Sequence, residues 1–192
     1  TSRLAILPIF TSFLPPMKHY VFADQFRALY IKAVDAYRRG HRGAQGLVTP
    51  AEAAFLAQNG IAVQHLYDYA EDDVNGGEPG YDRALLIEMV RRDYFLNVQN
   101  GQPSTTVLSE DSLPPKHAEA AGIAWLPRIL PKARAKLRGE LPPSLMYSCG
   151  GDRNFFRTHD IHPAEFLALI WRSRDHDEVV IEWVARRSAS KA

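Results

Sequence analysis

The residues best suited to chemistry lie in the segment 147–153, where a cysteine is followed by two glycines, an aspartate and an arginine. Adjacent glycines let backbone amides turn toward an anion. The candidate ligand-binding residues of this segment are Tyr147, Gly150, Gly151 and Arg153. Cys149 is a candidate nucleophile, and Asp152 is a candidate to act with it on a bound ligand. Because a thiol nucleophile requires a base or a positive charge nearby, Arg153, His159 or His162 would have to fold against Cys149.

The same segment also fits a purely structural role. Its glycines would form a turn between two helices, and free cysteine is among the most frequently buried residue types. No cysteine–histidine spacing of a known catalytic family is present. On this interpretation we expect Cys149 to be shielded beneath Tyr147 and Phe155 and to react slowly with thiol reagents.

Two groups of side chains have the chemistry of metal ligands. His65, Asp68 and Asp72 recur at three- and four-residue steps, so one helical face would present a histidine and two carboxylates. The second group consists of Cys149, Asp152, His159 and His162. Neither spacing matches the closely spaced ligand pairs of closed zinc sites, so we predict no metal site. We expect the acidic group to be solvated and paired with the arginines of the helix that follows it.

A basic segment is the third candidate site. Its members, with no acidic residue among them, are Arg128, Lys132, Arg134, Lys136 and Arg138. A nucleic-acid interface would add neighbouring bases and stacking aromatics, and Trp125 is the one aromatic that adjoins this segment. All five residues fall off the apolar face marked by Ile129, Ala133 and Leu137. The pattern therefore predicts the solvated back of a helix.

Composition restricts the class of protein. With 46% hydrophobic and 23% charged residues in a chain of 192, the sequence is typical of a globular protein. The single cysteine excludes an internal disulfide and suits a reducing cytoplasm. No run of about 18 apolar residues occurs, so we expect no membrane-spanning helix.

Apolar residues recur at helical spacing through most of the chain, which predicts an all-α fold. The longest predicted helices are Phe22–Arg39 and Asp82–Asn97. In the second, the apolar residues that should share one side are Leu85, Leu86, Met89, Val90 and Leu96. Pro131 lacks an amide and crowds the preceding turn, so we expect the helix that contains it to begin only near that residue.

The chain divides by composition into four parts. Residues 1–16 form an extension ahead of Met17 that we expect to be poorly ordered, and residues 17–100 form a helical region. A linker rich in Ser, Thr, Gln and Pro covers residues 101–121, and a helical C-terminal domain covers residues 122–187. The formal charge is −4 over residues 17–121 and +4 over residues 122–192, which indicates two units that could face each other. This imbalance is too small to indicate a nucleic-acid partner.

Several motifs of the C-terminal part resemble those of a known family. They are WLPRI, KARAKLRGEL, the turn from Tyr147 to Asp152, PAEFLALIW and DEVVIEWV. Through these motifs, residues 122–184 resemble the bacterial family described as domain of unknown function 5069. The resemblance implies a helical architecture and a bacterial source, and it supplies no activity, cofactor or partner.

Three functions from different classes follow from these features. The leading hypothesis is a small cytoplasmic module that binds a protein partner or a small ligand, because no feature requires chemistry. A small-molecule enzyme, with or without a bound metal, is the first alternative, with Cys149 and Asp152 in one pocket with His159 or His162. Contact with nucleic acid through the basic helix 128–138 is the second. A shared pocket would favour the enzyme, a flat apolar patch the protein partner, and a continuous basic surface the nucleic acid.

Overall fold

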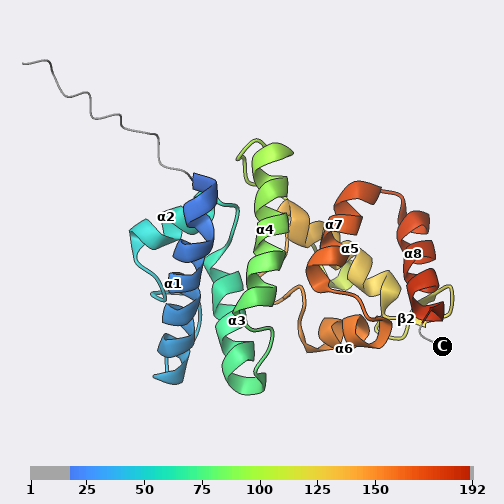
Figure 1. Ribbon diagram of the computed structural model, residues 1–192, viewed down its shortest axis with the longest axis horizontal. Coiled ribbons are helices and arrows are strands. Elements are labelled where there is room, and N and C mark those ends of the chain that lie inside the picture. The colour runs from blue at the N-terminus through green and yellow to red at the C-terminus, as the bar shows by residue number, and fades with distance from the viewer. Residues whose placement is uncertain (1–17, 191–192) are drawn as a thin grey trace, which may run out of the picture.

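The computed structural model describes residues 18–190, within which the chain forms eight α-helices, one short 3₁₀-helix and one two-stranded sheet (Figure 1). The elements are α1 (Lys18–Arg38), α2 (Pro50–Gln58), α3 (Val63–Gly76), α4 (Tyr81–Asn97), η1 (Glu110–Ser112), β1 (Glu119–Ala120), β2 (Ile123–Ala124), α5 (Leu126–Arg138), α6 (Gly150–His159), α7 (Pro163–Ser173) and α8 (Asp177–Ala189). The predicted all-α fold is therefore confirmed. No helix in the described part of the chain is long and apolar enough to cross a membrane. The predicted extension, residues 1–16, lies outside the described residues.

Side chains at the helix ends set where several helices begin and stop. The hydroxyl of Thr49 accepts a hydrogen bond from the Glu52 amide, and the Glu52 carboxylate accepts one from the Thr49 amide, so α2 begins with a capping box. α7 begins in the same way with His162 and Glu165. α5 ends at Gly139, whose φ of 72° is in the left-handed region that favours glycine.

α5 begins earlier than its sequence predicts. Its first residue is Leu126, and Pro131 lies inside the helix, so the predicted start near Pro131 was wrong. The Trp125 carbonyl accepts hydrogen bonds from the amides of residues 128 and 129, both at 3.0 Å, which close the first turn. Leu126 and Leu130 are buried in this part of the helix. Their burial offsets the backbone hydrogen bond that Pro131 cannot donate.

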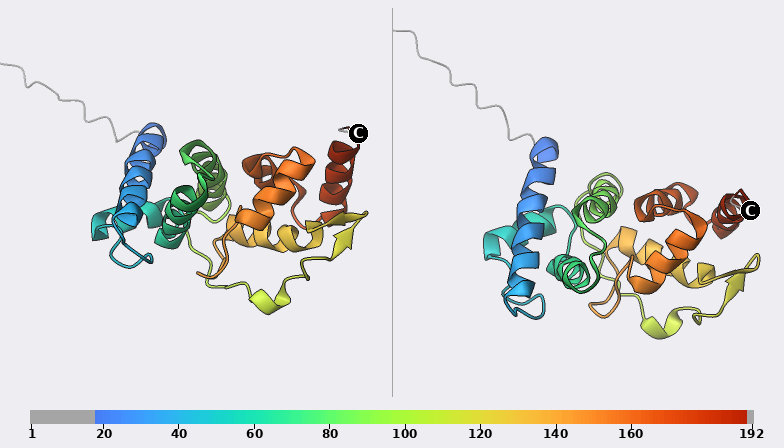
Figure 2. Two further views of the ribbon diagram at one scale, coloured as in Figure 1. Left: turned by 90° about the horizontal axis from the view of Figure 1, so that it is seen from below. Right: turned by 60° about the horizontal axis from the view of Figure 1, so that its bottom comes forward.

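α4 separates two hydrophobic clusters. One cluster is formed mainly by α1, α2 and α3, with Phe22, Phe26, Leu56 and Leu66 fully buried at its centre. The other is formed by α5 to α8, with Leu126, Ile129, Phe166 and Val184 fully buried. α4 contributes Ala84 to the first cluster and Ile87 to the second. Figures 1 and 2 show α4 between α1 and α3 on one side and α5 and α7 on the other.

The buried face of α4 differs from the predicted one. Leu86 and Met89 are exposed, whereas the polar residues Glu88, Arg91 and Arg92 are buried. The prediction was wrong because α4 packs on both sides and its polar side chains find partners there. Glu88, for example, pairs with Lys136 of α5.

The basic segment of α5 is also partly buried. Lys132 and Lys136 are 2% exposed, so the predicted solvated helix back was wrong for these two residues. The ammonium of Lys136 lies 2.5 Å from Oε1 of Glu88 on α4, and that of Lys132 lies 2.6 Å from Oδ2 of Asp152 on α6. Each lysine therefore pairs with a buried carboxylate of a neighbouring helix. A buried charge requires a partner of opposite charge.

The segment between α4 and α5 runs along one edge of the molecule (Figure 2). It falls largely in the predicted linker 101–121 and contains η1 and β1. β1 pairs with β2 in antiparallel register, Ala120 opposite Ile123, across a turn in which Ala121 and Gly122 both have positive φ. This hairpin leads directly to Trp125 at the start of α5.

We predict that Lys136→Met lowers the free energy of unfolding by about 3–5 kcal/mol, because it leaves the Glu88 carboxylate buried without its cation. Lys136→Met combined with Glu88→Leu should recover much of this loss, since no buried charge remains. Arg138→Met on the same helix is the control: its ion pair with Asp175 is exposed, so it should cost less than about 1 kcal/mol. Urea denaturation of the three variants measures these values, and equal losses for Lys136→Met and Arg138→Met would contradict the prediction.

Candidate functional site

A polar cleft of about 550 Å³ lies where α3 faces α5 and the start of α6. We call it the interface cleft. Its lining residues are Gln64, Tyr67, Asp68, Glu71, Asp72, Lys116, Trp125, Arg128, Lys132, Pro143, Ser144, Leu145, Met146, Cys149, Gly150 and Gly151. The acidic lining residues all belong to α3, and the basic ones belong to α5 or to the segment before it. The two walls therefore carry opposite charge.

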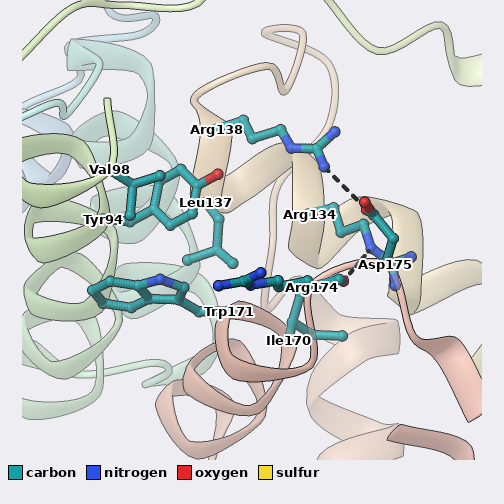
Figure 3. Close-up of a pocket in the computed structure, with 9 residues that line it drawn as sticks. All are labelled: Tyr94, Val98, Arg134, Leu137, Arg138, Ile170, Trp171, Arg174 and Asp175. Carbon is teal, nitrogen blue, oxygen red and sulfur yellow. Dashed lines mark hydrogen bonds and ion pairs between the residues drawn. The ribbon is translucent and has the colours of Figure 1, made fainter. Parts of the chain in front are cut away.

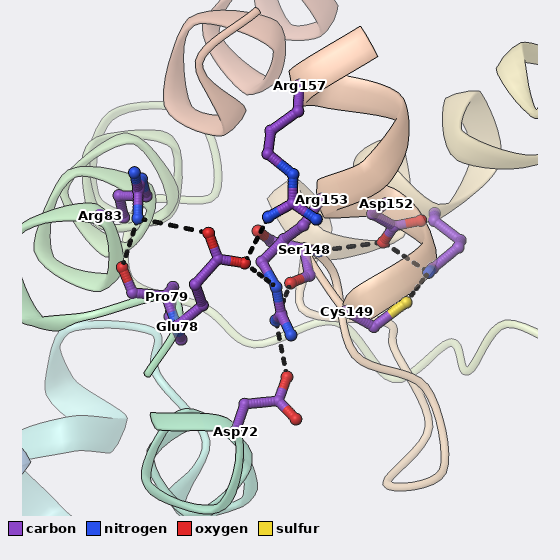
Figure 4. A network of polar contacts seen from close by, with 10 residues as sticks. Asp72, Glu78, Pro79, Arg83, Ser148, Cys149, Asp152, Arg153 and Arg157 are labelled. Atoms are coloured by element: carbon purple, nitrogen blue, oxygen red, sulfur yellow. Dashed lines mark hydrogen bonds and ion pairs between the residues drawn. The ribbon is translucent and has the colours of Figure 1, made fainter. Parts of the chain in front are cut away.

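Asp152 is the centre of the hydrogen bonding behind the cleft. Its carboxylate is fully buried and accepts from Lys132 Nζ at 2.6 Å, from Trp125 Nε1 at 2.9 Å and from the Ser148 amide at 2.9 Å. These donors satisfy both carboxylate oxygens, so Asp152 fixes the positions of the groups around it rather than facing a ligand. Of the sequence candidates, Asp152 and Cys149 are thus brought together (Figure 4). Lys132 contacts both side chains.

Trp125 packs directly over Gly151, the second residue of α6. A Cβ atom added to Gly151 would lie 2.5 Å from a carbon of the indole ring, so glycine at this position allows the close approach. Trp125 itself has a φ of 72°, a strained conformation for a bulky residue. Its hydrogen bond to Asp152 and the contact with Gly151 hold the ring in that orientation.

Cys149 lies on the wall of the interface cleft rather than beneath aromatic rings. It is partly exposed and occupies the N-cap position of α6 without a side-chain capping bond, and its sulfur lies 3.4 Å from Lys132 Nζ. Tyr147 is buried and directs its hydroxyl away, to the Pro163 carbonyl at 2.8 Å. The predicted shielding of Cys149 was therefore wrong. No local pattern could have identified the lysine, because 17 residues separate it from the thiol.

Arg153 links α6 to the N-terminal half at the edge of the cleft (Figure 4). Its guanidinium donates to Asp72 at 2.7 Å and to the Ser148 carbonyl at 2.8 Å, and it lies 3.0 Å from Glu78. Arg157 also pairs with Glu78, at 2.7 Å. Asp72 is thus paired with an arginine of α6 instead of the predicted arginines of α4. The ion pairs join the acidic and basic parts of the chain, as the charge distribution predicted.

His65 belongs to a buried cluster next to the cleft. Lys136 Nζ lies 3.0 Å from Nδ1 of His65, and Glu88 accepts hydrogen bonds from both Lys136 and Tyr69. Burial, followed by the nearby charge of Lys136, lowers the pKa of His65 to about 3. Burial alone would raise the pKa of Glu88, but the ammonium of Lys136 lowers it below its usual value. At neutral pH the cluster therefore holds a neutral imidazole and a carboxylate.

Asp68 is the titratable group of the acidic wall whose pKa is shifted most clearly. Burial raises the pKa of its carboxyl to about 6, and the charges of Glu71 and Asp72 act in the same direction. A hydrogen bond from Gln64 at 2.7 Å opposes the shift without reversing it. Asp68 therefore titrates close to pH 6. A charged group of a ligand placed beside it would shift this pKa.

The candidate histidines of the C-terminal part lie outside the interface cleft. His159, at the end of α6, lies 2.7 Å from the Ser188 hydroxyl of α8, and His162 caps α7. His65 is drawn into the Glu88 cluster, away from Asp72. Among residues 18–190, no three His, Cys, Asp or Glu side chains are grouped so that they could hold a metal ion.

The basic helix 128–138 presents fewer charges to solvent than its sequence indicates. Lys132 and Lys136 are buried in ion pairs, and Arg134 pairs with Asp177. Arg128 turns to the Pro114 carbonyl and lines the cleft. The basic side chains of α5 are therefore largely engaged by groups of the protein itself.

The comparisons with known proteins concern the part of the chain that forms the basic wall. Residues 113–192 match the model of a family described as Domain of unknown function (DUF5069). This match confirms the resemblance noted in the sequence. No curated protein and no solved structure matches the chain. The DUF5069 region contains Lys132, Cys149 and Asp152, whereas α3 and α4 precede it. The interface cleft is thus formed jointly by the DUF5069 region and the helices before it.

We predict that Gly151→Ala destabilises the DUF5069 region by about 1–3 kcal/mol, because the added methyl group displaces the Trp125 ring. The displaced ring loses its hydrogen bond to Asp152, so tryptophan fluorescence should change as well. Gly150→Ala is a matched control, since its added Cβ meets nothing closer than Arg153 at 3.9 Å. Denaturation with fluorescence detection compares the two, and a control as damaging as Gly151→Ala would refute the packing argument.

The low pKa of His65 predicts that the folded protein loses stability in acid. The imidazole binds a proton near pH 6.5 in the unfolded chain but only near pH 3 in the folded protein, so stability is complete above pH 6.5 and is lost as the pH falls. At pH 4 this loss amounts to about 3 kcal/mol. His65→Asn keeps an acceptor for Lys136 and should remove this part of the pH dependence. The exposed His117→Asn should leave it unchanged, and identical pH profiles for the wild type and His65→Asn would contradict the assignment.

Proposed function

We propose that the protein acts by binding, and that the interface cleft takes a small dipolar ligand with a cationic group at one end and an anionic group at the other. The observation that carries this proposal is the opposite charge of the two walls, with Asp68 and Glu71 on α3 facing Arg128 and Lys116. The volume of the interface cleft, about 550 Å³, is typical of small-molecule sites. A free amino acid or a dipeptide has this size and charge distribution.

The anionic end of the ligand would lie at the start of α6. Gly150 and Gly151 are the first residues of that helix and both line the cleft, so their amides and the helix dipole favour an anion there. Arg128 adds a guanidinium that can bind a carboxylate. The anion would thus be met by backbone amides and by one fixed positive charge.

The cationic end would lie against Asp68. Its pKa of about 6 means that the carboxyl is ionised at neutral pH and protonated in mild acid. A ligand ammonium favours the ionised form, so binding should release a proton near pH 6. Affinity should therefore fall as the pH drops below 6, since a protonated carboxyl cannot pair with a cation.

Calorimetric titration with the dipeptide Gly-Phe and with its N-acetylated and C-amidated forms tests this proposal. The unmodified dipeptide should bind, and blocking either end should weaken binding about tenfold or more, because each block removes one charge. Asp68→Asn and Arg128→Gln should weaken binding similarly, whereas Asp24→Asn, an exposed change on α1, should not. The proposal would be overturned if the blocked and unblocked peptides bound equally well. It would also be overturned if no amino acid or dipeptide bound at all.

A thiol-dependent enzyme is the second candidate, supported by the 3.4 Å contact between Lys132 Nζ and the sulfur of Cys149 on the cleft wall. The positive charge would favour attack by the sulfur on a bound ligand. The test is the rate at which iodoacetamide labels Cys149 at neutral pH, compared with free cysteine. A faster rate that a bound dipeptide suppresses supports the enzyme, and a rate at or below that of free cysteine eliminates it.

We place this activity in the cytoplasm of a bacterium. The unpaired Cys149 suits a reducing compartment, and the bacterial source is what the family resemblance implies.

A further inference from the structure

A second pocket, of about 370 Å³, lies between α4, the end of α5 and the end of α7 (Figure 3). It shares no lining residue with the interface cleft. We name it the arginine pocket after its principal side chains, Tyr94, Trp171, Arg134, Arg138, Arg174 and Asp175. We propose that it binds a small planar anion, an aromatic ring carrying a carboxylate or a phosphate. This site is independent of the function proposed for the cleft.

The aromatic part of the ligand follows from the pocket walls. Trp171 and Tyr94 meet edge to face, with ring centroids 5.6 Å apart, and neither ring is fully buried. Leu137 and Ile170 complete the apolar surface. A flat ring placed against Trp171 would bury apolar area and gain a stacking contact that an aliphatic ligand cannot make.

The anionic part follows from the guanidinium groups. Arg134 is paired with Asp177, and Arg138 lies 3.5 Å from Asp175 at the exposed edge of the pocket. Within residues 18–190, the guanidinium of Arg174 makes no hydrogen bond or ion pair, and its side chain extends toward the Trp171 ring (Figure 3). The pocket therefore contains a positive charge that its own carboxylates do not balance. A guanidinium matches the geometry of carboxylate and phosphate groups.

The backbone at Arg174 supports the same conclusion. Its φ of 52° and ψ of −117°, with the hydrogen bond from the His176 amide to the Ser173 carbonyl, define a type II′ turn with Arg174 at its second position. Glycine is the residue that adopts this conformation without strain, and an arginine there is strained. Glycine would form this turn without strain. We therefore attribute the arginine at this position to a function of its side chain.

The inference is tested on the full chain labelled with 5-fluorotryptophan, which gives one ¹⁹F signal for each of the three tryptophans. Trp171→Phe identifies the signal of Trp171. The probes are indole-3-carboxylate and adenosine monophosphate, with neutral indole and inorganic phosphate as controls. We expect at least one aromatic anion to shift the Trp171 signal and to bind about tenfold or more tightly than indole or phosphate. Which probe binds distinguishes a carboxylate site from a phosphate site.

Two substitutions separate the function of Arg174 from its effect on the backbone. Arg174→Gly and Arg174→Gln should both weaken binding of the probe about tenfold or more, because both remove the charge. Arg174→Gly should also raise the Tm by relieving the strained turn, whereas Arg174→Gln should not. Arg172→Gln, an exposed change on the same helix, should leave both properties unchanged. Wild-type binding by Arg174→Gln, or a Trp171 signal that no probe shifts at millimolar concentration, would overturn the inference.

Discussion

The burial of two lysines on one face of α5 is the constraint that organises this molecule. An ammonium group that leaves water must meet a carboxylate in close contact, because the energetic cost of an unpaired buried charge is large. Lys136 meets Glu88 of α4, and Lys132 meets Asp152 of α6. α5 thereby fixes the position of the N-terminal half through Lys136. It fixes the start of α6 through Lys132, which lies one helical turn before Lys136.

This constraint also accounts for where the interface cleft lies. Asp152 is held by Lys132, and Asp152 in turn holds Trp125 over Gly151. Lys136 holds Glu88, which keeps α3 and its acidic wall opposite α5 through the hydrogen bond from Tyr69. The lining of the cleft thus belongs to two halves whose separation is set by buried polar contacts. A ligand site built in this way has walls that are positioned before the ligand arrives.

Sequence reasoning recovered the two longest helices, α1 and α4, because helix formation depends on the local spacing of apolar residues. It failed where a residue's environment is set by a distant element. Lys132 and Lys136 follow Ile129 at three and seven residues, a spacing that places them on the buried face of α5. The prediction nevertheless placed both lysines off the apolar face of this helix, and that placement was wrong. Their partners, Glu88 and Asp152, could not be found from spacing at all.

The sequence grouped Cys149 and Asp152 but assigned them the wrong neighbours. Cys149 and Asp152 do lie together, yet the cation beside them is a lysine and not a histidine. The opposing wall on α3 was considered only as a metal site or a solvated end, since charge pairing across a cleft requires the tertiary structure. The arginine pocket had no sequence signature, because Tyr94, Arg134 and Trp171 lie on three separate helices.

The position of Glu88 bears on how the DUF5069 region can be used elsewhere. This carboxylate lies before the matched residues 113–192, whereas the lysine that it neutralises lies within them. The region taken by itself would expose the faces of α5 and α7 that α4 covers and would leave Lys136 without this partner. It is therefore not a self-contained module in this chain. A protein that carries the same region without α4 must supply a carboxylate from another element, or have a different residue at the position of Lys136.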